Sequence, residues 1–470
     1  MLSEGEDSLL ISTAARQTVK PYMSALKENR DPTQVEWRRL TTPSSEKMKS
    51  IDAGSKTDRD TFESMAEVIE ATQKLDFHPL DPFVASVASG VDARSVAEPD
   101  SKDKEEFEVA VEGYYAKPVS VEMGTVHGPD APMLVILPGI YGSTEGGFPA
   151  AFKKIAFERG MNYTILRNPL NSEMVDDEPI NHPGNMQIEA EATHAILRQL
   201  QEQKPDFFDN VSLAGYSYGA LLSANVAKYD EAVSPDGKRV IQGGVVALSP
   251  PQNLIHSMKQ LDSLRNLYAE GAGSVTATGI HYTSEISRHG YENFMESPLA
   301  TRGPGSNITE TKIADAYGSR NEMKDMVAQV DRQFGHKQLP PTWPEYFKRR
   351  RVLNEMTYEQ YTQEWFSKDP WLAEQGITAE TLAEKTSYEE ALESMTKTPV
   401  LTLVSQDDYI LNSEDVETYR ELASESEGLE YTRVMDHGGH VGLLFNPEVQ
   451  NLIGDFAFSA EHLGAREQAS

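Results

Sequence analysis

The stretch Gly215-Tyr216-Ser217-Tyr218-Gly219 decides the fold of this chain. An apolar, strand-like run at 211–214 precedes it, and a helix-like run that begins at Ala220 follows it. The pentad is therefore the Gly-x-Ser-x-Gly pattern in the strand-turn-helix context that gives the pattern its meaning. Glycine stands at both flanking positions because a side chain there would crowd the neighbouring backbone. We expect this turn to hold the hydroxyl of Ser217 exposed at the carboxyl end of a sheet.

Alternating patterns continue outward from the pentad and predict a mostly parallel sheet. Two opening strands are expected within 107–128, and later strands at 133–137, 163–166, 211–214, 244–248, 400–404 and 431–434. Helices are expected near 148–160, 186–200, 413–426 and 447–463. Strands that alternate with helices of this length indicate βαβ units in an α/β fold. The run 133–137 is apolar throughout, which is typical of a strand buried on both faces.

The sequence pattern divides the chain into three predicted regions. Residues 1–105 are expected to form a helical N-terminal extension and linker, with one apolar helix face at 61–75 and the linker at 97–104. Residues 106–251 and 396–470 are expected to form the α/β core. Between them, 252–395 reads as a mainly helical cap over the carboxyl ends of the strands, the edge at which open α/β sheets bind ligands.

Composition excludes several classes of partner and site. The 470 residues include 43 Lys and Arg against 74 Asp and Glu, for a formal net charge of -31. A field of this sign repels phosphate backbones, so we expect no nucleic-acid partner. The chain has no cysteine, which rules out disulfides, thiolate metal sites and cysteine nucleophiles. The only basic cluster, 348–351, is interpreted as a solvated helix face, with an anionic-ligand site as the alternative.

Nothing in the sequence indicates a membrane span. No apolar run approaches the roughly 20 residues that a membrane helix needs, and the acidic first residues do not resemble a secretory signal. We therefore favour a cytoplasmic location, and secretion after removal of a signal stays open. The sequence leaves the oligomeric state open.

A serine hydroxyl is a poor nucleophile and needs a base, which in turn needs an orienting acid. The sheet pattern places the acid after the strand at 400–404, where Asp407 and Asp408 stand. We favour Asp408, because the apolar residues that follow it can anchor the site, and keep Asp407 as second choice. The base is expected after the last strand, where His440 is favoured over His437 because paired glycines precede it.

Acyl transfer also needs N–H donors for the oxyanion. One is expected from the backbone of Tyr218, at the start of a helix where amides lack partners. The other is expected from the loop at 138–142, with Ile140 as first choice and Tyr141 as second.

Four pieces of the chain, at 137–142, 215–219, 407–408 and 438–442, together resemble the α/β-hydrolase superfamily. The Asp-Asp and Gly-Gly-His-x-Gly pieces are similar to those of its carboxylesterase and lipase branches. The resemblance covers about 106–250 and 396–465, and it departs from the family at Pro138, where a histidine is common. It implies an α/β-hydrolase fold and attack by Ser217 on an ester, thioester or amide carbonyl of a small-molecule substrate, without a cofactor.

Three alternative functions remain open beside the hydrolase. The same residues would serve an acyltransferase, and a non-catalytic binding or scaffold protein on the same fold is the alternative from another class. A peptidase is a weaker option within the same chemistry. The run Asp176-Asp177-Glu178 with His182 suggests a metal site, but a polar loop between strand and helix explains it better, so no metal is expected.

Overall fold

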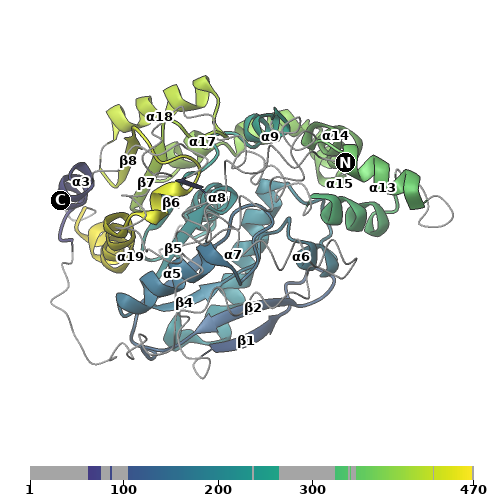
Figure 1. Ribbon diagram of the computed structural model, residues 1–470. Coiled ribbons are helices and arrows are strands. Elements are labelled where there is room, and N and C mark those ends of the chain that lie inside the picture. Colours follow the sequence, from purple (N-terminus) through teal and green to yellow (C-terminus); the bar gives the residue numbers. More distant parts are fainter. Residues whose placement is uncertain are drawn as a thin grey trace, which may run out of the picture.

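The computed structural model describes residues 62–75, 85–86, 104–234, 238–263, 323–336, 339, 346–426 and 428–467. An eight-stranded sheet runs through the middle of the molecule in the order β1-β2-β4-β3-β5-β6-β7-β8 (Figure 1). The strands are β1 (Lys104–Val109), β2 (Val119–Gly124), β3 (Met133–Leu137), β4 (Asn162–Ile165), β5 (Val211–Tyr216), β6 (Val245–Leu248), β7 (Val400–Ser405) and β8 (Glu430–Met435). β2 is antiparallel to both of its neighbours, and β4, β3, β5, β6, β7 and β8 pair in parallel.

The sheet is apolar on both faces, as the sequence predicts for 133–137. All five residues of β3 are buried, and so is every residue of β5, β6 and β7. Because side chains alternate along a strand, Leu134 and Ile136 enter one core cluster, and Val135 and Leu137 enter the other.

Helices cover both faces of the sheet. The cluster that holds Val135 also contains apolar residues of α7 (Met186–Gln203) and α8 (Tyr218–Val233). On the opposite face, α5 (Gly147–Glu158) and α19 (Pro447–Glu467) pack over Leu134 and its neighbours. α6 (Ser172–Asp176) lies between β4 and α7, and the short turn η4 (Pro205–Phe207) lies between α7 and β5. α18 (Ser413–Glu425) connects β7 to β8.

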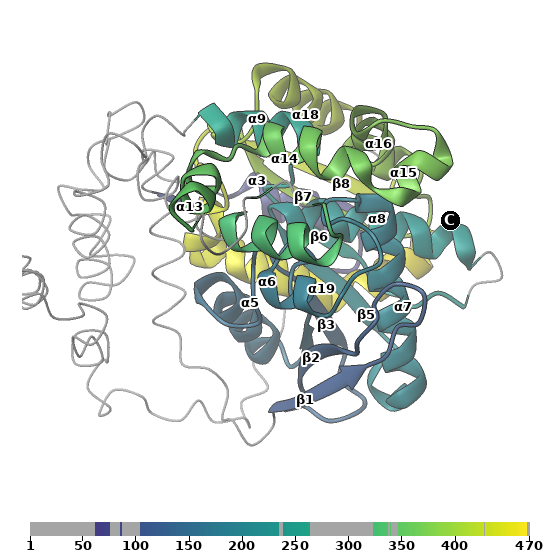
Figure 2. The ribbon, with the colours of Figure 1, turned by 90° about the vertical axis from the view of Figure 1, so that its right-hand side faces the viewer.

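The described part of 252–395 is built from helices. They are α9 (Leu254–Ser263), a helical segment at 323–333, α13 (Tyr346–Glu355), α14 (Tyr358–Glu364), η6 (Phe366–Lys368), α15 (Pro370–Gln375), α16 (Ala379–Lys385) and α17 (Tyr388–Glu393). In both ribbon views α9, α13, α14 and α15 group together, on the side of the molecule away from β1 (Figures 1 and 2). Residues 264–322 lie outside the described residues, and the division into core and cap stays a prediction.

The N-terminal extension contacts the core at two points. α3 (Met65–Gln73) buries Met65 and Val68 in the cluster that holds α19, and the backbone N–H of Phe62 donates to Ser459 Oγ on α19 at 3.0 Å. Further along, Ala85 is fully buried. Of the expected linker at 97–104, the structure describes only Lys104. It belongs to β1 rather than to a linker, because its backbone is paired with Gly124 of β2. Its Nζ lies 2.9 Å from Glu122 Oε2.

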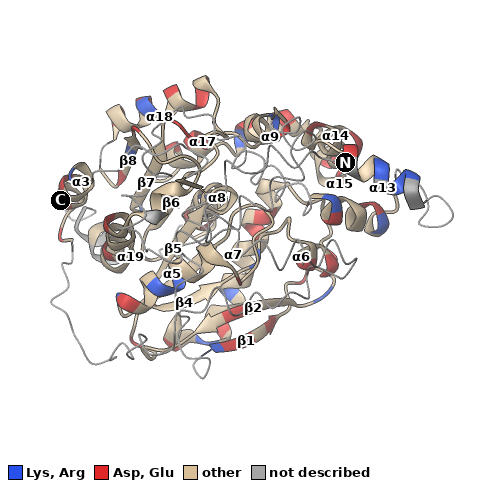
Figure 3. Cartoon of the chain, in the orientation of Figure 1, with Lys and Arg blue, Asp and Glu red and all other residues tan. Residues whose placement is uncertain are grey.

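Positions of both charges are spread over the helices and strands, and the basic run 348–351 lies on α13 (Figure 3). Arg351 Nε is 3.0 Å from Glu355 Oε1, and Arg349 Nη1 is 3.9 Å from Asp331 Oδ2. The exposed pair of Arg351 fits the interpretation of the run as a solvated helix face. Arg349 departs from it, because only 18% of its side chain is exposed and its partner Asp331 is buried. In the ranges that the structure describes, no helix combines the length and the apolar character needed to cross a membrane.

One ion pair lies inside the core. Lys153 of α5 and Glu122 of β2 are both almost fully buried, with 2.7 Å between Nζ and Oε1. Substitution of Glu122 by Gln would remove the carboxylate that pairs with the buried Lys153 ammonium. We expect Glu122→Gln to lower the free energy of unfolding by about 3–5 kcal/mol, measured by urea denaturation at pH 7.

The matched control is Glu158→Gln, which removes the carboxylate paired with the neighbouring Lys154 at 3.9 Å on the surface of the same helix. A half-exposed pair of this kind contributes about 0–1 kcal/mol. Equal effects of the two substitutions would contradict the prediction.

Candidate active site

The turn after β5 holds Ser217 in a strained conformation. Ser217 has φ 55° and ψ −129°, immediately before α8, and its N–H donates to the carbonyl of Leu248 at 2.9 Å. A Cβ at Gly215 would overlap the backbone of Gly219, and a Cβ at Gly219 would overlap the carbonyl of Leu137. The close approach of three backbone segments therefore requires both glycines, as predicted.

Ser217 is less exposed than the sequence predicts. It retains 8% of its accessible surface. The loop after β3 packs directly against it, so that a Cβ on Gly139 would lie 3.1 Å from Ser217 Cβ. The imidazole of His440 covers the hydroxyl itself.

The structure brings Ser217, His440 and Asp408 together at the carboxyl ends of β5, β8 and β7. His440 Nε2 lies 2.8 Å from Ser217 Oγ, and His440 Nδ1 lies 3.0 Å from Asp408 Oδ2. Both distances are within hydrogen-bonding range. The imidazole thus bridges the hydroxyl and the carboxylate, the arrangement in which a histidine can take a proton from serine while the acid fixes its tautomer. The catalytic roles of the three residues stay a prediction.

The residues that follow Asp408 fix the position of its carboxylate and of the His440 ring. Its side chain is fully buried, and its Oδ1 accepts the N–H of Ile410 at 3.1 Å. Tyr409 packs edge-on against the ring of His440, with 5.7 Å between ring centroids. One carboxylate oxygen is therefore committed to the backbone and the other faces the imidazole.

The other candidate acid, Asp407, contacts a different part of the histidine loop. Its Oδ1 accepts the N–H of Gly439 at 2.8 Å, and its Oδ2 lies 3.5 Å from His437 Nδ1. Burial raises the pKa of Asp407, and the hydrogen bond from Gly439 opposes this shift. The structure therefore brings Asp408, and not Asp407, to the imidazole of His440, and places the alternative base His437 beside Asp407.

The loop that carries His440 is tightly packed. Val441 has φ 62°, and its N–H donates to Ser249 Oγ at 3.0 Å. At Gly442, the first residue of η7 (Gly442–Phe445), a Cβ would lie 2.7 Å from the carbonyl carbon of Ala85. The N-terminal extension thus abuts the histidine loop two residues beyond His440, a contact that no local sequence pattern indicates.

The candidate oxyanion donors differ in whether their N–H groups are engaged. Tyr141 has φ 60°, and its N–H donates to Asn168 Oδ1 at 3.3 Å. Within the described ranges, the N–H groups of Ile140 and Tyr218 have no acceptor. This difference favours Ile140, the first choice from the sequence, over Tyr141, and the oxyanion role itself stays a prediction.

Two asparagines that the sequence analysis missed support the oxyanion loop. Asn168 Nδ2 donates to the carbonyl of Pro138 at 3.1 Å, and Asn171 Nδ2 donates to the carbonyl of Tyr141 at 2.8 Å. Pro138 offers no side-chain donor. The loop is instead held by the hydrogen bonds that the two asparagines donate to its carbonyls. A signal was present, since Asn168 precedes Pro169 at the carboxyl end of a predicted strand, where polar side chains gather.

Glu189 was also missed. It lies in the first turn of α7 with 6% of its surface exposed, and its Oε2 accepts the phenolic O–H of Tyr218. Burial raises the pKa of Glu189 to about 7, and the hydrogen bonds from Tyr218 and Gly184 oppose the rise. No sequence pattern marks this residue, because its partner is fixed only when α7 packs beside α8.

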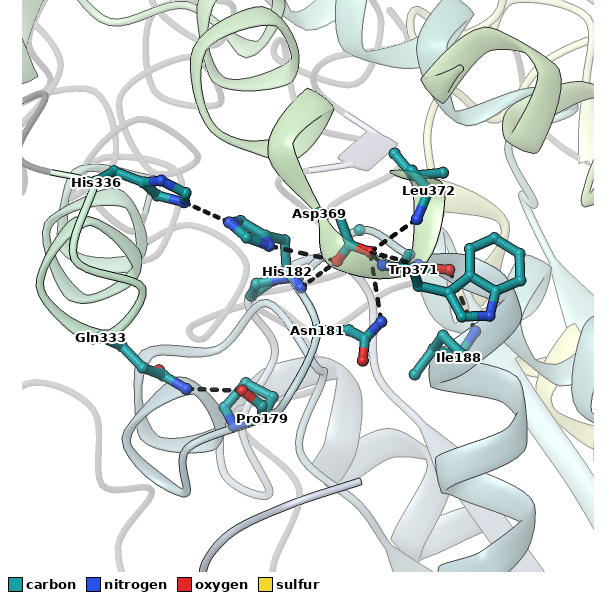
Figure 4. A network of polar contacts seen from close by, with 12 residues as sticks. Pro179, Asn181, His182, Ile188, Gln333, His336, Asp369, Trp371 and Leu372 are labelled. Atoms are coloured by element: carbon teal, nitrogen blue, oxygen red, sulfur yellow. Dashed lines mark hydrogen bonds and ion pairs between the residues drawn. The ribbon is translucent and has the colours of Figure 1, made fainter. Parts of the chain in front are cut away.

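The polar loop at 176–182 contacts the described helices of 252–395. His182 donates its backbone N–H to Asp369 Oδ2 at 2.6 Å and faces His336, with 2.5 Å between the Nε2 atoms (Figure 4). Gln333 Nε2 donates to the carbonyl of Pro179 at 2.8 Å in the same view. Among the described residues, no three His, Asp or Glu side chains are grouped to hold a metal ion.

No family model and no curated protein sequence matches this chain. Solved structures give distant likenesses. A Pyrococcus furiosus esterase is 14% identical with a TM-score of 0.41, covering 77% of this chain and 93% of its own. A proline iminopeptidase of Mycobacterium smegmatis is 13% identical with a TM-score of 0.39, covering 77% and 100%. An esterase of the fungus Rhizomucor miehei is 13% identical with a TM-score of 0.39, covering 85% and 97%.

Likenesses of this size carry no functional argument, and the fold rests on the architecture itself. The sheet is parallel from β4 to β8, and its serine sits on a strained strand-to-helix turn. The residues gathered at that turn follow the chain order serine, aspartate, histidine, which is the order of this architecture. The chain therefore has the fold of the α/β-hydrolase superfamily.

Proposed function

We propose that the protein is a serine hydrolase that cleaves a carboxylic ester through an acyl-enzyme on Ser217. The observation that carries the proposal is the continuous contact from Ser217 Oγ to His440 Nε2 and from His440 Nδ1 to Asp408 Oδ2, at 2.8 and 3.0 Å. A hydroxyl, an imidazole and a buried carboxylate in this order activate the hydroxyl as a nucleophile.

In the first half of the reaction, Ser217 Oγ attacks the acyl carbon while His440 Nε2 takes the hydroxyl proton. The carbonyl oxygen becomes an oxyanion, for which the unengaged N–H groups of Ile140 and Tyr218 are the proposed donors. Collapse of this intermediate breaks the bond to the leaving alcohol, and the protonated His440 returns its proton to the alcohol oxygen. Asp408 keeps Nδ1 protonated and stabilises the imidazolium.

In the second half, water replaces the alcohol. His440 takes a proton from water as the water oxygen attacks the acyl carbon, and the bond to Ser217 Oγ then breaks with return of that proton to the serine. These steps release the carboxylic acid and restore the free enzyme. Thioesters and amides follow the same course, and an alcohol in place of water would make the protein an acyltransferase.

The function is tested with a fluorophosphonate probe and p-nitrophenyl acyl esters. We expect the wild-type protein to be labelled at Ser217 and to hydrolyse the esters. Ser217→Ala should abolish the labelling and lower kcat by about 10⁵–10⁶-fold, because removal of the nucleophile leaves only the oxyanion site and binding.

Ser223 provides the matched control, because it is a buried serine on α8 whose Oγ donates to the carbonyl of Gly219. Ser223→Ala should keep the labelling. A wild-type protein that is neither labelled nor active on esters, thioesters or amides would overturn the proposal and favour a binding protein. Ester products carrying an added alcohol would indicate acyl transfer.

The adjacent aspartates give a second prediction. Asp408→Asn should lower kcat by about 10³–10⁴-fold, because an amide at this position favours the wrong tautomer of His440. Asp407→Asn keeps an acceptor oxygen for the Gly439 N–H and should lower kcat by less than about tenfold. Steady-state kinetics with one p-nitrophenyl ester measures both, and the reverse order of effects would reassign the acid to Asp407.

A further inference from the structure

We propose that Glu189 is a positioning residue that holds the Tyr218 end of the proposed oxyanion site, and that it does so fully only when its carboxylate is ionised. This inference rests on the proposed function. It concerns Tyr218 because this residue follows Ser217 directly and opens α8, so that its backbone N–H and its phenol belong to one rigid turn.

The contacts of Glu189 tie that turn to a neighbouring element. The phenolic O–H of Tyr218 donates to Glu189 Oε2, and the N–H of Gly184 donates to Oε1 at 2.6 Å. Tyr218 retains 1% of its accessible surface, so its phenol makes this contact away from solvent. Both carboxylate oxygens are therefore used as acceptors, one toward the serine turn and one toward the loop before α7.

The loop that contains Gly184 also contacts the helices of 252–395. Gly184 follows Pro183, whose carbonyl accepts the phenolic O–H of Tyr361 on α14 at 2.7 Å. It precedes Asn185, whose Nδ2 lies 3.4 Å from Asp369 Oδ1, at the N-terminus of α15. Glu189 thus stands between the serine turn and a loop that two other helices hold in place.

A buried carboxylate at this point is expensive for folding. Burial, with a smaller contribution from the nearby charge of Asp369, raises its pKa to about 7. The other titratable groups that face it are Tyr218 on α8, Tyr361 on α14, and three residues that line the same small cavity, Tyr114, Tyr115 and His182. No cation among the described residues pairs with Glu189, so its ionised form is held by hydrogen bonds alone.

Protonation changes what Glu189 can do. An ionised carboxylate accepts both hydrogen bonds, whereas a protonated one turns one oxygen into a donor. One of the two contacts, to Tyr218 or to Gly184, is then lost. Because an oxyanion donor acts only when it is fixed at the place where the charge develops, release of the Tyr218 turn should slow the chemical step rather than weaken substrate binding.

The test is Glu189→Gln, which has the shape of the protonated acid at every pH. We expect kcat to fall about tenfold at pH 8.5 with KM unchanged, a fraction of the 10²–10³-fold loss that follows removal of an oxyanion donor. The ratio of wild-type to variant kcat/KM should decline from about ten at pH 8.5 to about one at pH 5.5, with its midpoint near the Glu189 pKa of about 7. Effects of pH that are common to both proteins cancel in this ratio.

Thermal stability separates positioning from a structural role. The folded-state pKa of Glu189 is raised, so its contribution to stability is complete below the unfolded value of about 4.3 and is lost as the pH rises through about 7. At pH 8.5 the neutral Gln should therefore leave the Tm equal to that of the wild type or higher. A residue that served the fold alone would show a lower Tm.

The matched control lies two residues along α7. Glu191 Oε2 accepts the phenolic O–H of Tyr114 at 3.3 Å, a partly buried pair of the same chemistry away from the serine turn. Glu191→Gln should leave kcat and its pH dependence unchanged. Tyr218→Phe keeps the backbone N–H but removes the phenolic contact, and should reproduce the kcat loss of Glu189→Gln even if that variant folds poorly.

Each outcome decides the proposal. A pH-independent ratio near one for Glu189→Gln or Tyr218→Phe would overturn it, as would a kcat loss that is accompanied by a lower Tm and persists at pH 5.5. If wild-type Ser217 is not labelled by the fluorophosphonate probe, the proposed function fails and the inference fails with it. Labelled, active wild-type protein with unaffected variants would overturn the Glu189 inference alone.

Discussion

The structure depends on a close approach of backbones at the turn after β5. Gly219 lies against the carbonyl of Leu137, Gly215 lies against Gly219, and the N–H of Ser217 is bonded to Leu248. The ends of β3, β5 and β6 are thereby locked to one another and to the start of α8. A side chain at either glycine would push these segments apart. The strained φ of Ser217 is tolerated because the surrounding packing over-determines it.

Buried or partly buried carboxylates that accept backbone N–H groups recur around this turn. Asp408 accepts from Ile410, Asp407 accepts from Gly439, and Glu189 accepts from Gly184. In each case one hydrogen bond from a loop N–H fixes the position of the carboxylate and of the loop together. In a chain with 74 acidic residues these few matter because burial removes the water that screens the others.

Segments outside the sheet complete the surroundings of the candidate site. The N-terminal extension reaches the histidine loop, where Ala85 fills the space beside Gly442. The helices of 252–395 reach the loop before α7 through Asp369 and Tyr361. Both contacts join residues more than a hundred positions apart. The second contact accounts for the burial of Tyr361 on α14.

The sequence by itself determined the sheet, the helices that cover it and the order of Ser217, Asp408 and His440 along the chain, because alternation, apolar runs and glycine-flanked turns are local properties. It also favoured Asp408 and Ile140 over their neighbours. The tertiary structure alone decided what touches these residues: the asparagines that brace the oxyanion loop, Glu189 behind Tyr218, and the small exposure of Ser217. Such contacts join side chains from distant elements, and their distances depend on how helices and loops pack, which no local pattern records.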